Sequence, residues 1–160
     1  FAPYRLFTQD NIFTAKVVKV FRPDTISGKG LTLKQLAALA HYFPLTVEYH
    51  YASTDYTNEA YLRFKQRAIQ AVNSGNTYII VNFNRQYIGE MGGGHFSPLA
   101  AYDAKSDRFL LMDVARYRYP PVWVTSKALW HAMSDVDGSN KKPRGYIMLT
   151  SNENNKQNDA

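Results

Sequence analysis

Two stretches of the chain carry apolar residues at intervals of three and four. The first follows Thr32, a residue type favoured at helix N-caps, and the second covers residues 61–72. This spacing places the apolar side chains on one face of a helix. We therefore predict helices over residues 32–42 and 61–72, and a third that Thr125 or Ser126 caps.

Strand-length runs rich in β-branched and aromatic residues alternate with these stretches. They cover residues 47–51, 77–83, 95–102, 108–114 and 144–150. The polar segment 103–107 has the length of a hairpin connection, so the runs on either side of it should pair antiparallel. Helices that come early and strands that dominate later favour an α+β fold, an antiparallel sheet covered by helices on one side.

The length of 160 residues suits one domain with its own hydrophobic core. We expect residues 1–150 to form it, with a helical or irregular layer over residues 1–23, and the polar residues 151–160 to be a flexible tail. Hydrophobic residues make up 45% and charged residues 20%, as in ordinary globular proteins, which excludes a disordered or fibrous class.

The charge pattern and the missing cysteines exclude several partners. The formal net charge of +6 favours anionic ligands, but the cations are scattered singly, so we expect no nucleic-acid partner. The longest apolar run, around residues 79–81, falls far short of the ~20 residues that span a bilayer, so no membrane segment is expected. The chain has no cysteine, and His41, His50 and His131 lack metal-ligand spacing, so we expect no metal site.

The predicted hairpin carries the candidate chemistry. Counted from its polar tip, residues whose numbers sum to about 208 or 209 should lie opposite each other, and His95 and Asp113 sum to 208. Opposed residues have β-carbons roughly 4.5–5.5 Å apart, so a carboxylate can reach an imidazole. A histidine oriented by an aspartate is the base half of a nucleophilic triad. Spacing alone favours an ordinary strand histidine and a strand-end carboxylate, whereas the glycines at 92–94 and the apolar strand that Asp113 interrupts favour the catalytic interpretation.

Longer motifs surround these two residues. The chain resembles the phytochelatin synthases in the segments Gly92–Tyr102 (GGGHFSPLAAY), Asp113–Tyr117 (DVARY), Tyr119–Val124 (YPPVWV), Tyr4–Asn11 (YRLFTQDN) and Arg144-Gly145. The resemblance extends over nearly the whole chain and is nearest to the short prokaryotic members, which have no Cys-rich C-terminal extension.

The resemblance implies a papain-like cysteine protease fold and a triad of Cys, His and Asp. Such a triad removes glycine from glutathione through a γ-glutamylcysteinyl thioester, and His95 and Asp113 match its histidine and aspartate. The acyl group would then pass to water or to another glutathione, the second of which is phytochelatin synthesis. Prokaryotic members are associated mainly with hydrolysis.

Nothing in the chain matches the family's nucleophilic cysteine, which lies upstream of the part that resembles Tyr4–Asn11. We expect that the sequence, which starts at Phe1, begins after that segment; the alternative is a descendant that has lost thiol chemistry. Residues 1–150 would then be the C-terminal part of the catalytic domain, without its N-terminal nucleophile helix. We expect no acyl transfer by these residues alone.

Four residues match family positions that are expected near the substrate. Arg144 would form a forked pair with a carboxylate of the γ-glutamyl end. Asp137 would take its ammonium group, and Asn82 its other polar groups. Gly94 would let the substrate backbone approach closely. The simpler alternatives are a solvent-exposed arginine at a strand start for Arg144 and a plain turn glycine for Gly94.

The resemblance also implies which ligands to expect. No cofactor is required, the partners are glutathione and γ-glutamyl peptides or their metal thiolates, and activity is expected to respond to cadmium or other thiophilic metals. A homodimer stays open, as does a cytoplasmic or periplasmic location. Two other functions stay open as well: a catalytically inactive module that binds glutathione or γ-glutamyl peptides, and a general papain-like cysteine peptidase.

Overall fold

A computed structural model describes residues 30–53, 58–113 and 119–152. The chain divides into two compact units, Phe1–Leu31 and Thr32–Ala160, and every helix and strand in the described ranges belongs to the second. The layer expected over residues 1–23 lies outside the described residues.

The helix predicted behind Thr32 is present as α3 (Leu33–Ala40). The hydroxyl oxygen of Thr32 accepts the backbone N–H of Gln35, and the side-chain oxygen of Gln35 accepts the backbone N–H of Thr32. This reciprocal pair satisfies two of the donors that a helix start leaves without partners. α3 packs its buried side on Ile147 of the last strand.

The other two predicted helices are α4 (Asn58–Asn73) and α5 (Ser126–Ser134). Phe64, in the apolar stripe of α4, is fully buried. Of the two candidate caps for α5, Thr125 is the N-cap, since its hydroxyl oxygen accepts the backbone N–H of Ala128. No helix in the described part of the chain combines the length and the apolar character that crossing a membrane requires.

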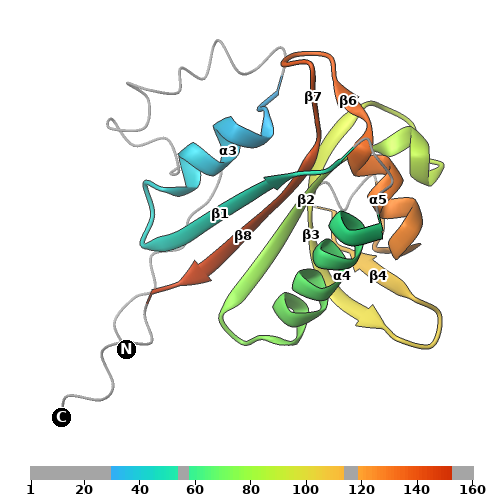
Figure 1. Ribbon diagram of the computed structural model, residues 1–160, viewed down its shortest axis with the longest axis horizontal. Helices are drawn as coiled ribbons and strands as arrows, with labels where there is room; N and C mark the ends of the chain where they lie inside the picture. Colours follow the sequence, from blue (N-terminus) through green and yellow to red (C-terminus); the bar gives the residue numbers. More distant parts are fainter. Residues whose placement is uncertain (1–29, 54–57, 114–118, 153–160) are drawn as a thin grey trace. The chain divides into compact units, whose positions relative to one another are not determined.

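The main sheet has six antiparallel strands in the order β1-β8-β2-β3-β4-β5, and Figure 1 shows the first five side by side. Their bounds are Leu45–Tyr51 (β1), Thr77–Asn84 (β2), Gly94–Asp103 (β3), Arg108–Leu111 (β4), Val122–Thr125 (β5) and Gly145–Ser151 (β8). A separate two-stranded ribbon pairs β6 (Val136–Asp137) with β7 (Lys142–Pro143). All five predicted strands are present, whereas β5, β6 and β7 were not predicted; β6 and β7, of two residues each, are too short to carry a recognisable pattern.

Helices cover both faces of the sheet, so the prediction of helices on one side was wrong. Neighbouring residues of a strand point to opposite faces, and Tyr146 and Ile147 of β8 are both buried. Tyr146 belongs to the core formed with α4 and α5, whereas Ile147 packs with α3. A strand buried on both faces is typically a continuous apolar run, and residues 146–149 form one.

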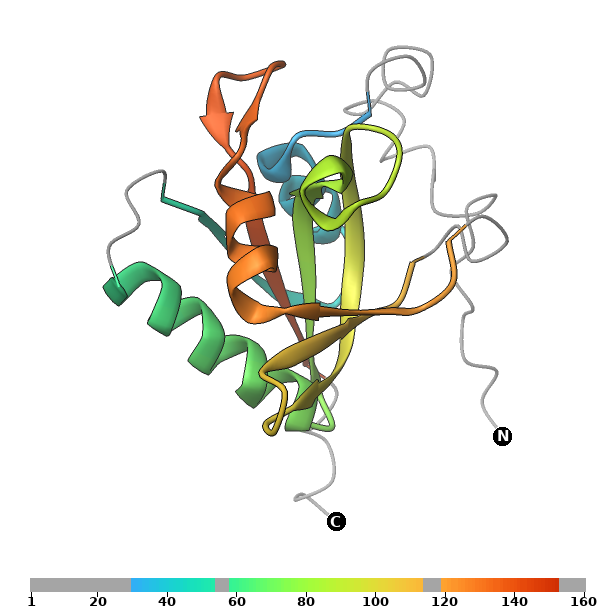
Figure 2. The same cartoon turned by 90° about the vertical axis from the view of Figure 1, so that its right-hand side faces the viewer.

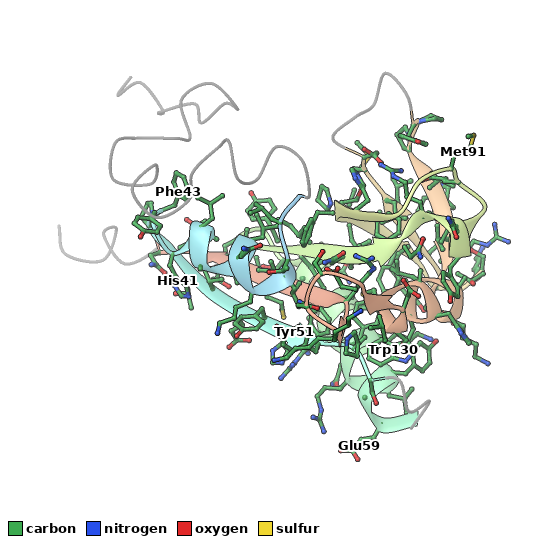
Figure 3. The ribbon with its side chains drawn as sticks, turned by 90° about the horizontal axis from the view of Figure 1, so that it is seen from above. His41, Phe43, Tyr51, Glu59, Met91 and Trp130 are labelled. Carbon is green, nitrogen blue, oxygen red and sulfur yellow. The ribbon has the colours of Figure 1, made fainter. Side chains whose placement is uncertain are left out.

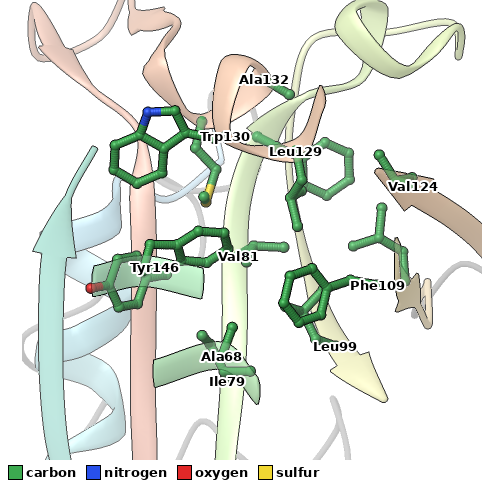
Figure 4. Packing of buried hydrophobic residues seen from close by; sticks show 14 of the residues in the cluster. Ala68, Ile79, Val81, Leu99, Phe109, Val124, Leu129, Trp130, Ala132 and Tyr146 are labelled. Atoms are coloured by element: carbon green, nitrogen blue, oxygen red, sulfur yellow. The ribbon is translucent and has the colours of Figure 1, made fainter. Parts of the chain in front are cut away.

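The larger core supports the strands that carry the candidate site. Phe64 and Phe109 are completely buried, and the ring centroid of Phe64 lies 5.1 Å from Tyr146 and 5.5 Å from Trp130. Figure 4 shows Val81 and Tyr146 within this cluster. Close packing of large side chains makes the sheet a rigid platform, because few voids remain into which a strand could shift.

The hairpin of β3 and β4 has a different register from the predicted one. Its Cα partners include Tyr102 with Phe109 and Leu99 with Leu111, whose numbers sum to 211 and 210 rather than 208. The register shifts between Leu99 and Ala101, an irregularity of the bulge type that increases local twist. Figure 2 shows the result, with β4 and β5 running across the direction of β2.

Two predicted boundaries also differ from the structure. β4 ends at Leu111, three residues before the predicted end at 114. At the other end of the chain, Ser151 pairs with Leu45 as the last residue of β8, and Thr46 donates a hydrogen bond to Asn152. The strand therefore extends past the boundary predicted at residue 150, and residues 153–160 of the expected tail lie outside the described ranges.

Candidate active site

His95 and Asp113 are in contact. His95 is the second residue of β3, and Asp113 follows the end of β4 by two residues. The distance from His95 Nε2 to Asp113 Oδ1 is 3.1 Å. Leu99 pairs with Leu111, so the same register carried two residues further places Asp113 opposite Ser97. His95 is two residues from Ser97 on the same face of β3 and is therefore the diagonal neighbour of Asp113. The contact is thus present in spite of the register error, because long side chains span the diagonal.

An arginine that the sequence analysis missed binds the second oxygen of Asp113. Arg85 opens the short 3-10 helix η1 (Arg85–Ile88) that follows β2. Its Nη2 lies 2.6 Å from Asp113 Oδ2, and its Nη1 pairs with the carboxylate of Glu90. The side chains of Arg85 and Asp113 are each 6% exposed, so water and salt screen this ion pair little.

The position of Arg85 in the sequence contains a signal that could have identified it. It directly follows a strand of eight residues that buries Val81, Asn82 and Phe83. A guanidinium so close to the core requires anionic partners, because an unpaired buried charge is very costly. The sequence therefore indicates that carboxylates lie nearby, but not which ones.

Tyr119 covers the guanidinium of Arg85. The Cζ atom of Arg85 lies 3.8 Å from the centroid of the Tyr119 ring, a cation–π contact. The Tyr119 hydroxyl donates to the carbonyl oxygen of Met91 at 3.1 Å. Met91 itself is 85% exposed and projects from the loop before β3 (Figure 3). Tyr119 therefore ties this loop to the segment that precedes β5.

The surroundings of His95 favour the neutral imidazole. Burial lowers the pKa of His95 below its ordinary 6.5, and the positive charge of Arg85 lowers it further. Asp113 and Glu90 raise the pKa, but the net direction is downward. Because Nε2 faces Asp113, Nδ1 is the nitrogen on the other side of the ring and is available in the neutral form as a base.

The four residues predicted to bind substrate lie together around one guanidinium. Arg144 Nη1 donates to Asn82 Oδ1 at 3.3 Å and lies 3.7 Å from Asp137 Oδ2. A Cβ atom added at Gly94 would lie 2.0 Å from Arg144 Nη1. Gly94 is thus a strand residue that makes room for Arg144, not a turn glycine, and Arg144 is 11% exposed rather than open to solvent.

Asp135 and Asn84 complete this cluster and were missed by the sequence analysis. Asp135 Oδ2 accepts a hydrogen bond from Asn84 Nδ2 at 2.9 Å and lies 3.5 Å from Arg144 Nε. Arg144 Nε is buried and makes no hydrogen bond within the described part of the chain. Asn82 and Asn84 alternate along an otherwise apolar strand, which is a signal that they share one face.

The two clusters lie on opposite faces of the sheet, at the same end of β2 and β3. Phe83 pairs with His95, and the ring centroids of these residues lie 6.1 Å apart, whereas Asn84 pairs with Gly94. Adjacent residues of a strand point to opposite faces. The contact with Asp113 is therefore made on the face of Phe83, and the Arg144 cluster lies on the face of Asn84.

The remaining histidines show no catalytic arrangement. No three His, Asp or Glu side chains in residues 30–53, 58–113 and 119–152 form a group that could hold a metal ion. His50 Nε2 lies 3.0 Å from Arg67 Nη1 and 3.7 Å from a Glu48 oxygen, and burial lowers its pKa. This histidine thus joins β1 to α4.

Known sequences match the chain over most of its length. The family model for phytochelatin synthase matches residues 1–146. Glutathione gamma-glutamylcysteinyltransferase 2 of Arabidopsis thaliana is 30% identical over 148 residues, which are 92% of this chain and 31% of that protein. The corresponding protein 1 of the same plant is 31% identical over 148 residues, 92% of this chain and 29% of its own length. Glutathione gamma-glutamylcysteinyltransferase of Schizosaccharomyces pombe is 29% identical over 124 residues, 78% of this chain and 29% of its own length. The chain spans about three tenths of the length of these relatives.

Proposed function

Because the chain belongs to the phytochelatin synthase family, we propose that it supplies the base half of a papain-like site that removes glycine from glutathione. The observation that carries this proposal is the 3.1 Å contact between His95 Nε2 and Asp113 Oδ1. The names of the relatives, which specify γ-glutamylcysteinyl transfer, support the choice of glutathione as the acyl donor. The proposed reaction needs a nucleophilic cysteine in addition to these 160 residues, which contain none.

In the proposed reaction, the cysteine sulfur attacks the carbonyl carbon of the cysteinylglycine bond of glutathione. His95 Nδ1 takes the thiol proton and then gives it to the nitrogen of the departing glycine, which leaves a γ-glutamylcysteinyl thioester. Water or the amine of a second glutathione next attacks the thioester carbonyl, and His95 takes its proton. The C–S bond then breaks, and the departing cysteine sulfur takes that proton back from His95. Asp113 keeps the imidazole in one tautomer and stabilises the imidazolium that forms between these steps.

The Arg144 cluster suits the γ-glutamyl end of the substrate, which carries an α-carboxylate and an α-ammonium group. Both clusters lie where β2 ends and β3 begins, so a glutathione bound across this end of the sheet would present its γ-glutamyl end to Arg144 and its cysteinylglycine bond to His95. Arg144 Nε is buried, makes no hydrogen bond to a described residue and lies 3.5 Å from Asp135 Oδ2, so a ligand carboxylate that displaced Asp135 would pair with the guanidinium. Asp137 lies 3.7 Å from the same guanidinium and would receive the ammonium group. A cation and an anion side by side favour a zwitterion over a ligand with a single charge.

An inactive module that binds γ-glutamyl peptides is the second candidate. It is favoured by the combination of a cysteine-free sequence with an Arg144 cluster whose ion pairs, at 3.5 and 3.7 Å, are long enough for a ligand to replace. Calorimetry on the chain of 160 residues tests it directly. Saturable binding of glutathione that Arg144→Ala abolishes would support a functional pocket in the absence of the nucleophile.

The experiment that tests the enzyme proposal measures glycine release from glutathione by a protein that joins this chain to the cysteine segment. We expect His95→Ala to lower the rate by about 10²- to 10⁴-fold, since general base catalysis is lost. His41→Ala, which alters an exposed histidine at the end of α3, is the matched control and should leave the rate unchanged. Near-normal release by His95→Ala would refute the role of His95. Cleavage of α-linked peptides but not of glutathione would instead indicate a general peptidase.

A further inference from the structure

Asp113 is held by a different partner on each carboxylate oxygen. Oδ1 lies 3.1 Å from His95 Nε2, and Oδ2 lies 2.6 Å from Arg85 Nη2. The two oxygens belong to one planar group, so a partner that immobilises Oδ2 also decides where Oδ1 points. A guanidinium suits this task because its N–H groups have a rigid planar geometry.

Arg85 is itself immobilised by its neighbours. Its Nη1 pairs with the carboxylate of Glu90, and its Cζ lies 3.8 Å from the centroid of the Tyr119 ring. Its backbone N–H donates to the carbonyl oxygen of Gly93 at 3.0 Å. The guanidinium is thus anchored by its own loop and by Tyr119, and it transmits that anchoring to Asp113.

We propose that Arg85 is a positioning residue that acts through Asp113, orienting the carboxylate so that neutral His95 carries its proton on Nε2 and keeps Nδ1 as the base. Glu90 keeps the guanidinium in place and balances its charge. The inference rests on the proposed function, in which the Nδ1 base takes the proton of the nucleophile. It adds to that function a residue 28 positions away in the sequence from Asp113.

A purely structural role for Arg85 is the competing explanation. Removing one partner of a buried ion pair destabilises a protein strongly, so a loss of stability alone does not distinguish the two. The effect of each charge on the pKa of His95 does distinguish a positioning role from a purely structural one. Among the described residues, the charged groups that act on the imidazole are Asp113, Arg85 and Glu90, of which Arg85 lowers the pKa of His95 and Glu90 raises it. Substitutions at Arg85 and Glu90 should therefore move the pKa of His95 in opposite directions.

The test is nitrogen-15 NMR of the His95 imidazole in the chain of 160 residues, which reports the tautomer and the pKa without any substrate. Arg85→Lys keeps the charge but loses the forked geometry, and we expect it to reduce the fraction of the Nε2–H tautomer. Arg85→Gln should raise the pKa of His95, and Glu90→Gln should lower it. Arg63→Lys is the matched control, because Arg63 pairs with Glu59 on the exposed side of α4.

The outcomes separate this inference from the proposed function. An unchanged tautomer in Arg85→Lys, or an unchanged pKa in Glu90→Gln, would overturn the inference even if thermal unfolding shows a loss of stability. In the cysteine-containing protein, Arg85→Lys should lower kcat by about tenfold to a hundredfold and leave KM nearly unchanged, since a small misplacement affects the reacting geometry most. If the NMR results follow the expectation and no form releases glycine, the proposed function fails while the positioning role of Arg85 stands.

Discussion

The two charged clusters at the end of β2 and β3 are built in different ways. Around Asp113 the contacts are short, at 2.6 Å to Arg85 and 3.1 Å to His95. Around Arg144 the ion pairs measure 3.5 Å to Asp135 and 3.7 Å to Asp137, and Nε makes no hydrogen bond to a described residue. The first cluster is a network of short contacts, whereas the second is held by longer ones.

This difference fits two different tasks. A base must keep its proton on one nitrogen, and a network whose groups already satisfy each other holds that state without rearranging. A pocket must exchange its internal contacts for contacts with a ligand, which is easiest where those contacts are long. Gly94 and His95 are adjacent in β3 but belong to different clusters. A substitution in one cluster should therefore affect either binding or turnover and leave the other unchanged.

The largest effect is expected from Asp113→Asn, which breaks the network of short contacts. In the cysteine-containing protein we expect turnover to fall about 10³- to 10⁴-fold, because an amide can stabilise the wrong imidazole tautomer. Single-turnover release of glycine measures the loss, and calorimetry should find glutathione binding nearly unchanged. An equal loss of binding and turnover would contradict the separation of the two clusters.

A smaller effect is expected from Gly94→Ala, which breaks the Arg144 cluster. The new Cβ atom would lie 2.0 Å from Arg144 Nη1, so the guanidinium must move. We expect glutathione to bind about ten- to a hundredfold more weakly, the size of one lost hydrogen bond to a charged group. Calorimetry measures this change.

The neighbouring glycine provides the matched control for that substitution. Gly93→Ala adds the same methyl group where no heavy atom lies within 4 Å, so binding should persist. The tautomer of His95 should be unchanged in both variants. A shifted tautomer in Gly94→Ala would show that the two faces are coupled.

The smallest effect concerns pH and sharpens the description of the network of short contacts. The pKa of His95 is lowered in the folded chain from an ordinary value of 6.5. At a pH between the folded-state pKa of His95 and 6.5, the unfolded chain binds more protons than the folded chain. The free energy of unfolding therefore decreases as the pH drops from above 6.5 toward the folded-state pKa, and His95 does not affect it well above 6.5.

Urea unfolding at several pH values, from about 5 to 8, measures this dependence. His95→Gln should show a weaker decrease in stability on acidification than the unmodified chain. His50, whose pKa is also lowered, contributes to both proteins equally, so the difference between them isolates His95. Equal slopes in the two proteins would contradict the lowered pKa of His95.

Much of the secondary structure was predictable because its signals are local. Thr32 and Gln35 form a capping box within four residues, and α4 shows its apolar stripe in its own sequence. The same holds for strands of seven or more residues, such as β1 and β8. Strands of two residues, such as β6 and β7, are too short for a periodic pattern, and the four-residue β5 was missed as well.

The candidate site was predictable in part. Resemblance to a family identified His95 and Asp113 in one cluster and four residues of the other, which the geometry brings together: Asn82, Gly94, Asp137 and Arg144. Arg85 was not predicted, since it lies 28 residues from Asp113 and no local pattern links the two. Its position directly after a buried strand indicated only that a carboxylate must lie close to its guanidinium.

By itself the sequence determined the α+β class, most helix and strand positions, and the family, whose resemblance pointed to His95 and Asp113. Only the tertiary structure decided the hairpin register, the covering of both sheet faces and the partners of each charge. The shift between Leu99 and Ala101 illustrates the reason. Register and twist depend on how whole strands pack against the core, so contacts between distant residues follow from the assembled sheet and not from any short stretch of sequence.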